Sequence, residues 1–523
     1  MMTNIAKILN SRIYIPLLVL GVIIRLISLL TKGMEDVDVM INWGLNISNL
    51  GWDKGYLAIY FPSSHFIFNA IVEISKAFDF EVFNLFTIIR LSSDILFLLL
   101  LVYLNKLRFL SKPIILLIWL NPLLLVLTLS GYTDTFSITL LLASLVSLYV
   151  YQERNNRYFA IISGFLFAFF LFLKPQSLLL MIYLYFFIFI FIAFRMYTKK
   201  VFDNLFLSVS LLLPSLVMFF LFSVLLSSPT KMSCGENIGP RTISSLENSN
   251  QTEWNVCIDL SQVGIPYPDS GPNICVEKQF KAFSPLGSNG FCVTNYKYLL
   301  PTTVNDFWET GYIKLKNQVI NGSAEHMPSY SANMPNFWHI YVVNFLNYDE
   351  AKEVWSYKAT EEFNKTVWVS ILIFTFSYSL LLFWIYRNKV NNYLALISLI
   401  GFPITFVIPF FATLAHENHF ALGLLFSYLL LNLNLFRSRF TKLFHILLLV
   451  ISLSLALNIS RLYLWPMWVD SQNPILHKFG TNLINLIGIP NIYQISLITS
   501  LAALVLIISL PLGASASNKK PVI

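Results

Sequence analysis

The chain has 523 residues, of which 56% are hydrophobic and only 12% are charged, and its mean hydropathy is +0.67. Soluble domains carry about 45–50% apolar and about 25% charged residues, so this composition excludes a soluble protein and indicates a polytopic membrane protein. The net charge of +8 comes from basic residues spread in twos and threes between apolar runs. This pattern is not a phosphate-binding patch, so we expect no nucleic-acid partner.

Twelve apolar runs along the chain have the length of membrane-spanning helices, each of which needs roughly 20 mostly apolar residues. They lie near residues 13–31, 85–104, 113–130, 135–151, 158–173, 177–194, 205–227, 366–386, 392–412, 419–435, 443–462 and 493–512. The first run lacks a small-residue cleavage site, so we expect an uncleaved first span. The predicted fold class is an all-α polytopic membrane protein with about twelve transmembrane helices.

Lysine and arginine residues cluster at every second boundary between these runs. The clusters are Lys7/Arg12, Lys106/Arg108/Lys112, Arg154/Arg157, Arg195/Lys199/Lys200, Arg387/Lys389, Arg437/Arg439/Lys442 and Lys519/Lys520. Cytoplasmic loops carry an excess of Lys and Arg, so all the clusters and both termini are predicted to be cytoplasmic. We expect a multi-pass protein of the bacterial inner membrane, or of the endoplasmic reticulum membrane if the source is eukaryotic.

The opposite, extracytoplasmic side holds a first loop over residues 32–84 and a large polar loop over 228–365. The predicted organisation is an N-terminal transmembrane catalytic module (1–227), the extracytoplasmic loop domain (228–365) and a C-terminal transmembrane module (366–523). The large loop contains all four cysteines: Cys234, Cys257, Cys275 and Cys292. Cysteines confined to one extracytoplasmic segment predict two disulfides with three possible connectivities, and free thiols are the alternative.

Polar residues collect at the outer ends of the predicted spans. Glu35, Asp36 and Asp38 directly follow the first span. Further outer turns read SGYTDTF (130–136), FLKPQS (172–177), LAHENHF (414–420) and ISRLYLW (459–465). A transporter would place its ionisable residues near the membrane midplane. Here they share one rim, as a site acting at the outer leaflet needs.

Several of these residues also have a structural interpretation. Asp134 is suited to capping the helix that follows Gly131, and Lys174 is suited to snorkelling from a helix end. His416 and His419 depart from the zinc-protease HExxH pattern, although two histidines three residues apart leave a metal site open.

The second span carries two charged residues within its apolar sequence. Arg90 and Asp94 are four residues apart, which predicts an intramembrane ion pair facing the helix bundle. We interpret this pair primarily as a structural element of the bundle and not as part of the functional site.

Together these stretches resemble the GT-C superfamily, the polytopic glycosyltransferases that use a polyprenyl- or dolichyl-phosphate sugar as donor. EDVDVMINW (35–43) looks like the acidic motif that precedes an amphipathic helix in the first outer loop of such enzymes. Its D-x-D form, Asp36 and Asp38, is like that of GPI mannosyltransferases. The interval from Asp36 to Trp43 is similar to that of dolichyl-phosphate-glucose-dependent glucosyltransferases.

Later turns extend the resemblance to roughly residues 10–465. YFPSSHF (60–66) resembles the family's tyrosine–proline–proline stretch and departs from it at Ser63. GYTDTF looks like the GQ.D turn with Tyr132 in place of glutamine, LKPQ matches the lysine-bearing turn, and HENHF is similar to the HERY turn. The 228–365 loop carries no recognisable motif, so the sequence does not indicate the acceptor.

The resemblance implies a hexosyltransferase, such as a mannosyltransferase, that inverts the anomeric carbon. Its donor would be a polyprenyl- or dolichyl-phosphate sugar, and its acceptor a hydroxyl of a lipid-linked or cell-surface glycan at the outer face of the membrane. The chemistry needs a general base and positive charge where the leaving phosphate develops charge. Asp36 and Asp38 are the candidate bases, and Lys174, His416 and Arg461 are the candidate phosphate-binding residues.

The choice between the two acids depends on local structure. On an extended segment positions 36 and 38 share a face, whereas an early helix brings positions 35 and 38 together; the Trp43 interval favours Asp36. No cofactor is certain, and a divalent cation such as Mg²⁺ or Mn²⁺ at the acidic motif stays open. We expect these further residues to bind substrate: Glu35, Trp43, Tyr60, Asp134, Gln176, Glu417 and His419.

Three other functions compete with this prediction. A transporter or flippase of lipid-linked sugars would show interrupted helices in corresponding halves, and the sequence has no internal repeat. A glycan polymerase or ligase that uses diphosphate-linked carriers would carry arginines where this chain has Asp36 and Asp38. A non-enzymatic scaffold gives no reason for acids, Lys174 and His416 to share one rim.

Overall fold

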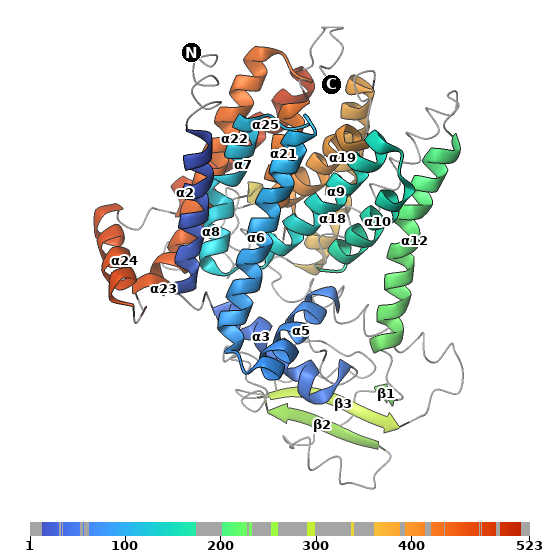
Figure 1. The fold of residues 1–523 in the computed structure, drawn as a ribbon, viewed down its shortest axis with the longest axis vertical. Helices are drawn as coiled ribbons and strands as arrows, with labels where there is room; N and C mark the ends of the chain where they lie inside the picture. The colour runs from blue at the N-terminus through green and yellow to red at the C-terminus, as the bar shows by residue number, and fades with distance from the viewer. Residues whose placement is uncertain are drawn as a thin grey trace.

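The chain forms a bundle of long helices with two amphipathic helices and a small sheet at one end, as the computed structural model shows (Figure 1). The residues that the structure describes are 13–30, 33, 35–52, 56, 62–173, 201–226, 230–232, 253–259, 290–298, 336–338, 360–387, 393–413, 420–433, 435–469, 471, 473–487 and 492–513.

The N-terminal part of the chain contributes nine α-helices and one short 3-10 helix to the described residues. They are α2 (Tyr14–Leu26), the 3-10 helix η1 (Ile27–Leu30), α3 (Glu35–Leu50), α5 (Pro62–Phe78), α6 (Val82–Lys106), α7 (Lys112–Trp119), α8 (Pro122–Ser130), α9 (Asp134–Arg154), α10 (Arg157–Leu171) and α12 (Val201–Leu226).

The C-terminal part continues the bundle and contains two π-helical segments, η5 and η6. Its elements are α18 (Glu361–Tyr386), α19 (Tyr393–Phe402), η5 (Pro403–Val407), α20 (Ile408–Phe411), α21 (Phe420–Asn432), α22 (Ser438–Ile459), η6 (Ser460–Leu464), α23 (Trp465–Val469), α24 (Pro474–Ile487) and α25 (Ile492–Leu512).

Six helical stretches are long and apolar enough to cross a membrane. They are Val82–Lys106, Lys112–Ser130, Asp134–Arg154, Glu362–Tyr386, Tyr393–Phe411 and Ser438–Ile459. Shorter apolar helices cover Tyr14–Leu30, Arg157–Leu171, Phe206–Phe222, Phe420–Asn432 and Leu497–Leu512. Each of these stretches coincides with one predicted span, and the predicted span 177–194 lies outside the described residues. The helices thus support the multi-pass membrane protein that the composition predicts.

A sharp break between α8 and α9 follows from local sequence signals. Asn121 caps α8, because its Oδ1 accepts from the backbone N–H groups of Leu123 and Leu124 at 3.0 and 3.3 Å. Pro122 occupies the first turn, where its missing N–H costs nothing. The helix ends at Gly131, whose φ of 93° is a left-handed conformation that favours glycine. The chain then enters α9 at Asp134.

Helices α3 and α5 pack closely against each other at the sheet end of the bundle (Figure 1). A Cβ on Gly44 would lie 2.6 Å from the carbonyl oxygen of Phe68. Only a residue without a side chain permits this approach of the two backbones. Apolar side chains of α3 and α5 then bury one another, among them Met40, Ile41 and Ile71.

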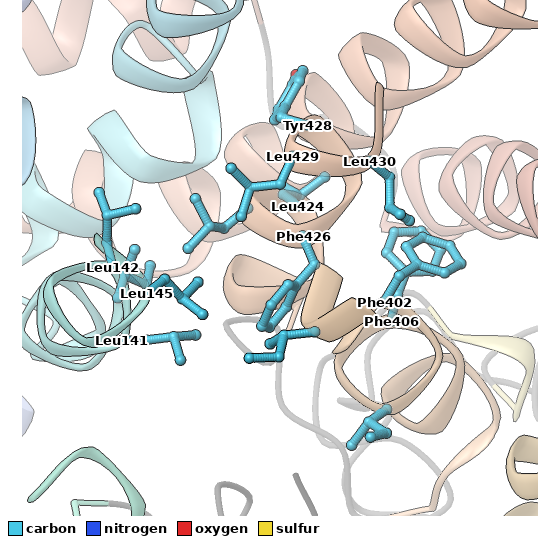
Figure 2. Packing of buried hydrophobic residues seen from close by; sticks show 14 of the residues in the cluster. Leu141, Leu142, Leu145, Phe402, Phe406, Leu424, Phe426, Tyr428, Leu429 and Leu430 are labelled. Atoms are coloured by element: carbon cyan, nitrogen blue, oxygen red, sulfur yellow. The ribbon is translucent and has the colours of Figure 1, made fainter. Parts of the chain in front are cut away.

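The largest hydrophobic cluster draws on both the N- and C-terminal parts of the chain. Figure 2 shows Leu141, Leu142 and Leu145 of α9 facing α21, while Phe402 and Phe406 lie on its other side. The rings of these two phenylalanines stack with centroids 4.9 Å apart. The predicted modules 1–227 and 366–523 therefore share one core in the described residues.

The large 228–365 loop contains a three-stranded antiparallel sheet of β1 (Thr230–Met232), β2 (Glu253–Asp259) and β3 (Gly290–Tyr298), in the order β1-β3-β2. This sheet departs from the predicted all-α class, because that prediction came from the apolar spans and not from the polar loop. The register places Cys257 opposite Cys292 on neighbouring strands.

A second part of the same loop is tied to the helix bundle. The fully buried Asn336 donates from Nδ2 to the carbonyl of Ala412 at 2.9 Å, and its own carbonyl accepts from Ser500 Oγ at 3.0 Å. The indole of Trp338 donates to the carbonyl of Phe411. These bonds connect residues 336–338 to the end of α20 and to α25.

Candidate functional site

The acidic motif is helical from Glu35 onward, since α3 begins at that residue. The extended arrangement that would place positions 36 and 38 on one face is therefore wrong. Positions 35 and 38, three residues apart, share a face of the helix instead, which was the alternative. Asp38 is exposed, whereas Val37 beside it is buried. The inward face of α3 packs on α5 and decides which residues point outward.

The start of α3 lies directly against the α8–α9 turn. A Cβ placed on either Gly33 or Gly131 would come within 2.7 Å of Val37 Cγ2, and both glycines have positive φ. A Cβ on Gly33 would also lie 3.5 Å from the Gly131 Cα atom. The tertiary structure thus brings together the acidic motif and the SGYTDTF turn, as a common rim requires.

Asp134 lies at the beginning of α9, one residue after the N-cap Thr133. It is therefore not the capping residue, although an acid in the first helical turn interacts favourably with the helix dipole. Both Asp134 and Tyr132 are buried.

A second pair of sequence motifs also meets. Ser64 Oγ donates to the carbonyl of Leu173 at 2.5 Å, and the backbone N–H of Ser63 donates to the carbonyl of Phe172 at 3.1 Å. The YFPSSHF stretch therefore contacts the residues that directly precede Lys174. Ser63 stands where the family's stretch has its second proline, and it supplies a backbone N–H donor that proline lacks.

Aromatic rings line the α3–α5 interface. Trp43 is buried and stacks on His65, with ring centroids 5.1 Å apart and an interplanar angle of 20°. Tyr56 approaches the same imidazole edge-on at 4.6 Å, and burial raises the pKa of its hydroxyl, which therefore stays neutral. Trp43 was predicted to bind substrate; in this structure its ring contacts His65 and Phe68.

An ionic cluster lies inside the bundle beneath the α8–α9 turn. It consists of Arg25 from α2 and of Arg90 and Asp94 from α6, with exposed fractions of 2%, 0% and 3%. Both charged residues of the second span thus face the bundle, as predicted. The close ion pair is nevertheless formed with α2: Arg25 Nε lies 3.5 Å from Asp94 Oδ2. Asp94 Oδ2 also accepts from Thr128 Oγ1 at 2.8 Å.

Both terminal nitrogens of Arg25 have hydrogen-bond acceptors, and its Nε faces Asp94 in the ion pair without a hydrogen bond. Its Nη1 donates to the carbonyl of Gly21 at 3.1 Å, and its Nη2 donates to the carbonyl of Trp119 at 3.0 Å. The guanidinium carbon lies 3.5 Å from the centroid of the Trp119 ring, a cation–π contact. The sequence analysis did not single out Arg25. A charged residue within the first apolar run is nevertheless a signal for an intramembrane ion pair or a functional residue.

Arg90 has a different environment. Its Nε, Nη1 and Nη2 atoms are buried and have no hydrogen-bond partner in the structure as described. Asp94 attracts it electrostatically, and the Phe86 ring centroid lies 5.8 Å from its guanidinium carbon. Its Nη1 lies 2.8 Å from the point that a Cβ on Gly131 would occupy. Nη1 of Arg90 is therefore beside the turn where the acidic motif and SGYTDTF meet.

Arg461 approaches this region from the C-terminal part of the chain. It lies in η6 and is partly buried. Leu464 of the same segment packs with Leu129 at the C-terminal end of α8, together with Trp465 and Trp468. The predicted phosphate-binding residue Arg461 is therefore on an element that contacts the helix leading into the SGYTDTF turn.

The other predicted site residues cannot be placed. Tyr60, Lys174, Gln176, His416, Glu417, His419, Cys234 and Cys275 lie outside the described residues. Asp36 is on α3, but the described part does not extend to its side chain or to that of Glu35. Within the ranges that are described, no three His, Cys, Asp or Glu side chains group as a metal site would require, and the cation at the acidic motif stays a prediction.

An apolar groove runs along the outward face of α6, with a volume of about 370 Å³. Leu29 of η1 forms one wall, and α6 side chains between Ile88 and Leu99 form the other. The groove lies on the side of α6 away from Arg90, because positions 88, 92, 95 and 99 share one helix face and position 90 lies on another.

No protein-family model matches this chain, and a search of curated proteins finds no match to it.

Proposed function

We propose that the chain is an inverting glycosyltransferase with twelve transmembrane helices. It moves a hexose from a polyprenyl-phosphate-linked donor to a hydroxyl of a lipid-linked or cell-surface glycan at the extracytoplasmic face. The proposal rests on the residues that resemble the GT-C superfamily and on how they are arranged. The sugar and the acceptor stay open.

One observation carries the proposal: motifs distant in sequence meet at one end of the bundle. The start of the acidic helix α3 touches the α8–α9 turn through Gly33, Val37 and Gly131. The hydrogen bonds of Ser63 and Ser64 join the second motif to the residues before Lys174. These contacts are packed and buried, and the convergence of the motifs that they bring about supports a common site.

The sidedness of the helices also supports a site at the outer face. Helix α6 begins next to α5 and ends at Lys106, and α9 begins at the α8–α9 turn and ends at Arg154. The basic C-terminal ends of α6 and α9 are thus at the end of the bundle remote from the acidic motif. Since cytoplasmic loops are enriched in Lys and Arg, the acidic motif is on the extracytoplasmic side.

In the proposed reaction, the acceptor hydroxyl oxygen bonds to the anomeric carbon as the bond from that carbon to the phosphate oxygen breaks. The hydroxyl proton passes to a carboxylate, and the polyprenyl phosphate leaves with the bonding electrons. A single displacement inverts the anomeric configuration. Asp36 is the proposed base and Asp38 its competitor; Lys174, His416 and Arg461 stabilise the leaving phosphate.

The test is a transfer assay with the purified full-length protein and polyprenyl-phosphate-linked mannose or glucose. The acceptor is a membrane extract from cells of the source organism that lack this chain. We expect a product of inverted anomeric configuration. Asp36→Asn should lower the rate by about 10²–10⁴-fold, because it removes a general base. Asp38→Asn should act more mildly.

An Asp36→Asn protein with more than about a tenth of the wild-type rate, beside an inactive Asp38→Asn protein, would reverse the assignment of the base. If the wild type consumes no phosphate-linked sugar donor at all, the transferase proposal fails.

A transporter or flippase of lipid-linked sugars is the second candidate. The observation that favours it is the buried cluster of Arg25, Arg90 and Asp94, since charges within membrane spans often mark substrate pathways. Reconstituted vesicles distinguish the two functions. A flippase moves an intact labelled lipid-linked sugar between leaflets without an acceptor, whereas the transferase leaves the donor in place until an acceptor is added.

A further inference from the structure

The buried cluster beneath the α8–α9 turn has an unbalanced charge. Arg25 and Arg90 each contribute one positive charge and Asp94 one negative charge, so the three side chains leave one positive charge without a counterion. Burying a charge is costly unless the charge is paired and hydrogen-bonded. Arg25 meets that requirement through Asp94, Gly21 and Trp119.

Arg90 does not meet it. All three of its guanidinium nitrogens lie without a hydrogen-bond partner at 0% exposure. The Asp94 oxygen that approaches Arg25 also accepts from Thr128. Among the described residues, Arg90 is thus a fully buried cation whose donors are unused.

One of the unused donors, Nη1, lies beside the junction of the acidic helix and the α8–α9 turn. Both Arg90 Nη1 and the Gly33 Cα atom lie close to the position of a Cβ on Gly131, at 2.8 and 3.2 Å. Neither glycine has a side chain, and the Val37 Cγ2 methyl group, 2.7 Å from the same point, fills the junction between the acidic helix and the turn. Access to the guanidinium from this side therefore requires the start of α3, with Val37, to move away from the turn.

We propose that Arg90 is an anion-binding residue of the outer site, and that its ligand is a phosphoryl group, carried by the lipid-linked substrate. The planar guanidinium matches the oxygens of a phosphoryl group, with which it forms two parallel charge-assisted hydrogen bonds. Such a ligand supplies the negative charge that the cluster lacks. It also supplies the hydrogen-bond acceptors that Arg90 lacks. The choice of a lipid-linked phosphoryl group rests on the proposed function; the need for an anion does not.

The experiment compares Arg90 with Arg25, a similarly buried arginine that is ion-paired with Asp94 and donates hydrogen bonds from both Nη atoms. The thermal stability of the purified full-length protein is measured in detergent with increasing polyprenyl phosphate. Uncharged polyprenol of the same length controls for the apolar chain, and inorganic phosphate tests for a free-phosphate source. The variants are Arg90→Met and Arg25→Lys, with Arg90→Lys as a second variant that keeps the charge but loses the planar fork.

We expect polyprenyl phosphate, but not polyprenol, to raise the melting temperature of the wild type. Arg90→Met should raise the half-saturating concentration about tenfold or more, because hydrogen bonds to a charged group are lost, and Arg90→Lys should raise it less. Arg25→Lys should melt at a lower temperature yet keep the wild-type half-saturating concentration. If inorganic phosphate raises the melting temperature of the wild type but not of Arg90→Met, Arg90 is still the anion-binding residue and its ligand is free phosphate.

Two results overturn the proposal: an unchanged half-saturating concentration in both Arg90 variants, or no response of the wild type to either phosphate. The transfer assay separates this proposal from the proposed function. If polyprenyl phosphate binding depends on Arg90 but the protein transfers no sugar, the proposed transferase function is refuted and the proposed anion site is supported. If Arg90→Met transfers sugar and binds polyprenyl phosphate as the wild type does, the proposed anion site is refuted and the proposed transferase function is supported.

Discussion

Two buried arginines that share one carboxylate should respond in opposite ways to the same substitution. Arg25→Met is expected to destabilise the fold strongly, whereas Arg90→Met is expected to leave it as stable as the wild type or more stable. The reason is that Arg25 donates from both Nη atoms and is ion-paired with Asp94, whereas no nitrogen of Arg90 has an acceptor. Methionine keeps most of the volume of an arginine side chain without its polar atoms, so neither change leaves a large cavity.

The magnitudes follow from the contacts of each residue. Arg25→Met breaks the ion pair at 3.5 Å, removes two hydrogen bonds to carbonyl groups and leaves Asp94 without its nearest partner. Breaking a buried pair in this way costs about 3–5 kcal/mol. Arg90→Met removes a buried charged donor that has no acceptor, and such a group costs about 1–3 kcal/mol or more.

Asp94 also loses an attractive charge when Arg90 is replaced, which offsets part of that gain. The net change for Arg90→Met is then between no effect and about 2 kcal/mol of stabilisation. The two variants should differ from each other by about 3–7 kcal/mol.

Unfolding in mixed micelles with increasing SDS, followed by far-UV circular dichroism, measures both variants in the same detergent without added lipid. The wild type and Arg25→Lys provide the reference. Equal destabilisation by Arg90→Met and Arg25→Met would refute the reasoning, because it would mean that Arg90 has partners as strong as those of Arg25.

Two further predictions concern the loop and the phosphate site. Because the strand register places Cys257 opposite Cys292, we expect these two cysteines to be linked, and mass spectrometry of unreduced peptides should recover that pair and no other partner for either. Impermeant thiol reagents should label the loop of intact cells only after reduction; labelling without reductant would contradict the disulfides. Lys174→Ala should weaken use of a polyprenyl-phosphate sugar far more than it lowers the melting temperature, and unchanged donor affinity and turnover would place the phosphate elsewhere.

The predicted behaviour of Arg90 links stability to function. A buried guanidinium without an acceptor weakens the fold, and its positive charge is of use only when an anion arrives. Strain or unsatisfied groups of this kind are typical of sites that must bind a ligand. If Arg90→Met is the more stable protein and the poorer phosphate binder, both observations have the same cause.

The amino-acid sequence by itself determined the membrane-spanning helices. In a bilayer each backbone polar group must bond within its own segment, so a long apolar run has few alternatives to a helix. The stretches from Tyr14–Leu30 to Leu497–Leu512 accordingly fall on predicted spans. Sequence spacing also placed Arg90 and Asp94 inside the bundle, because residues four apart share a helix face.

Only the tertiary structure decided which of these elements meet. The partner of Asp94 is Arg25, on a different helix, and no local pattern in α6 selects it. The acidic motif is helical from Glu35, with Val37 packed on Gly33 and Gly131 and Gly44 packed on α5, and these contacts favour the helix over the extended alternative. Local spacing sets which residues share a face of one element, whereas the burial that aligns one element with another depends on chain segments far apart in sequence.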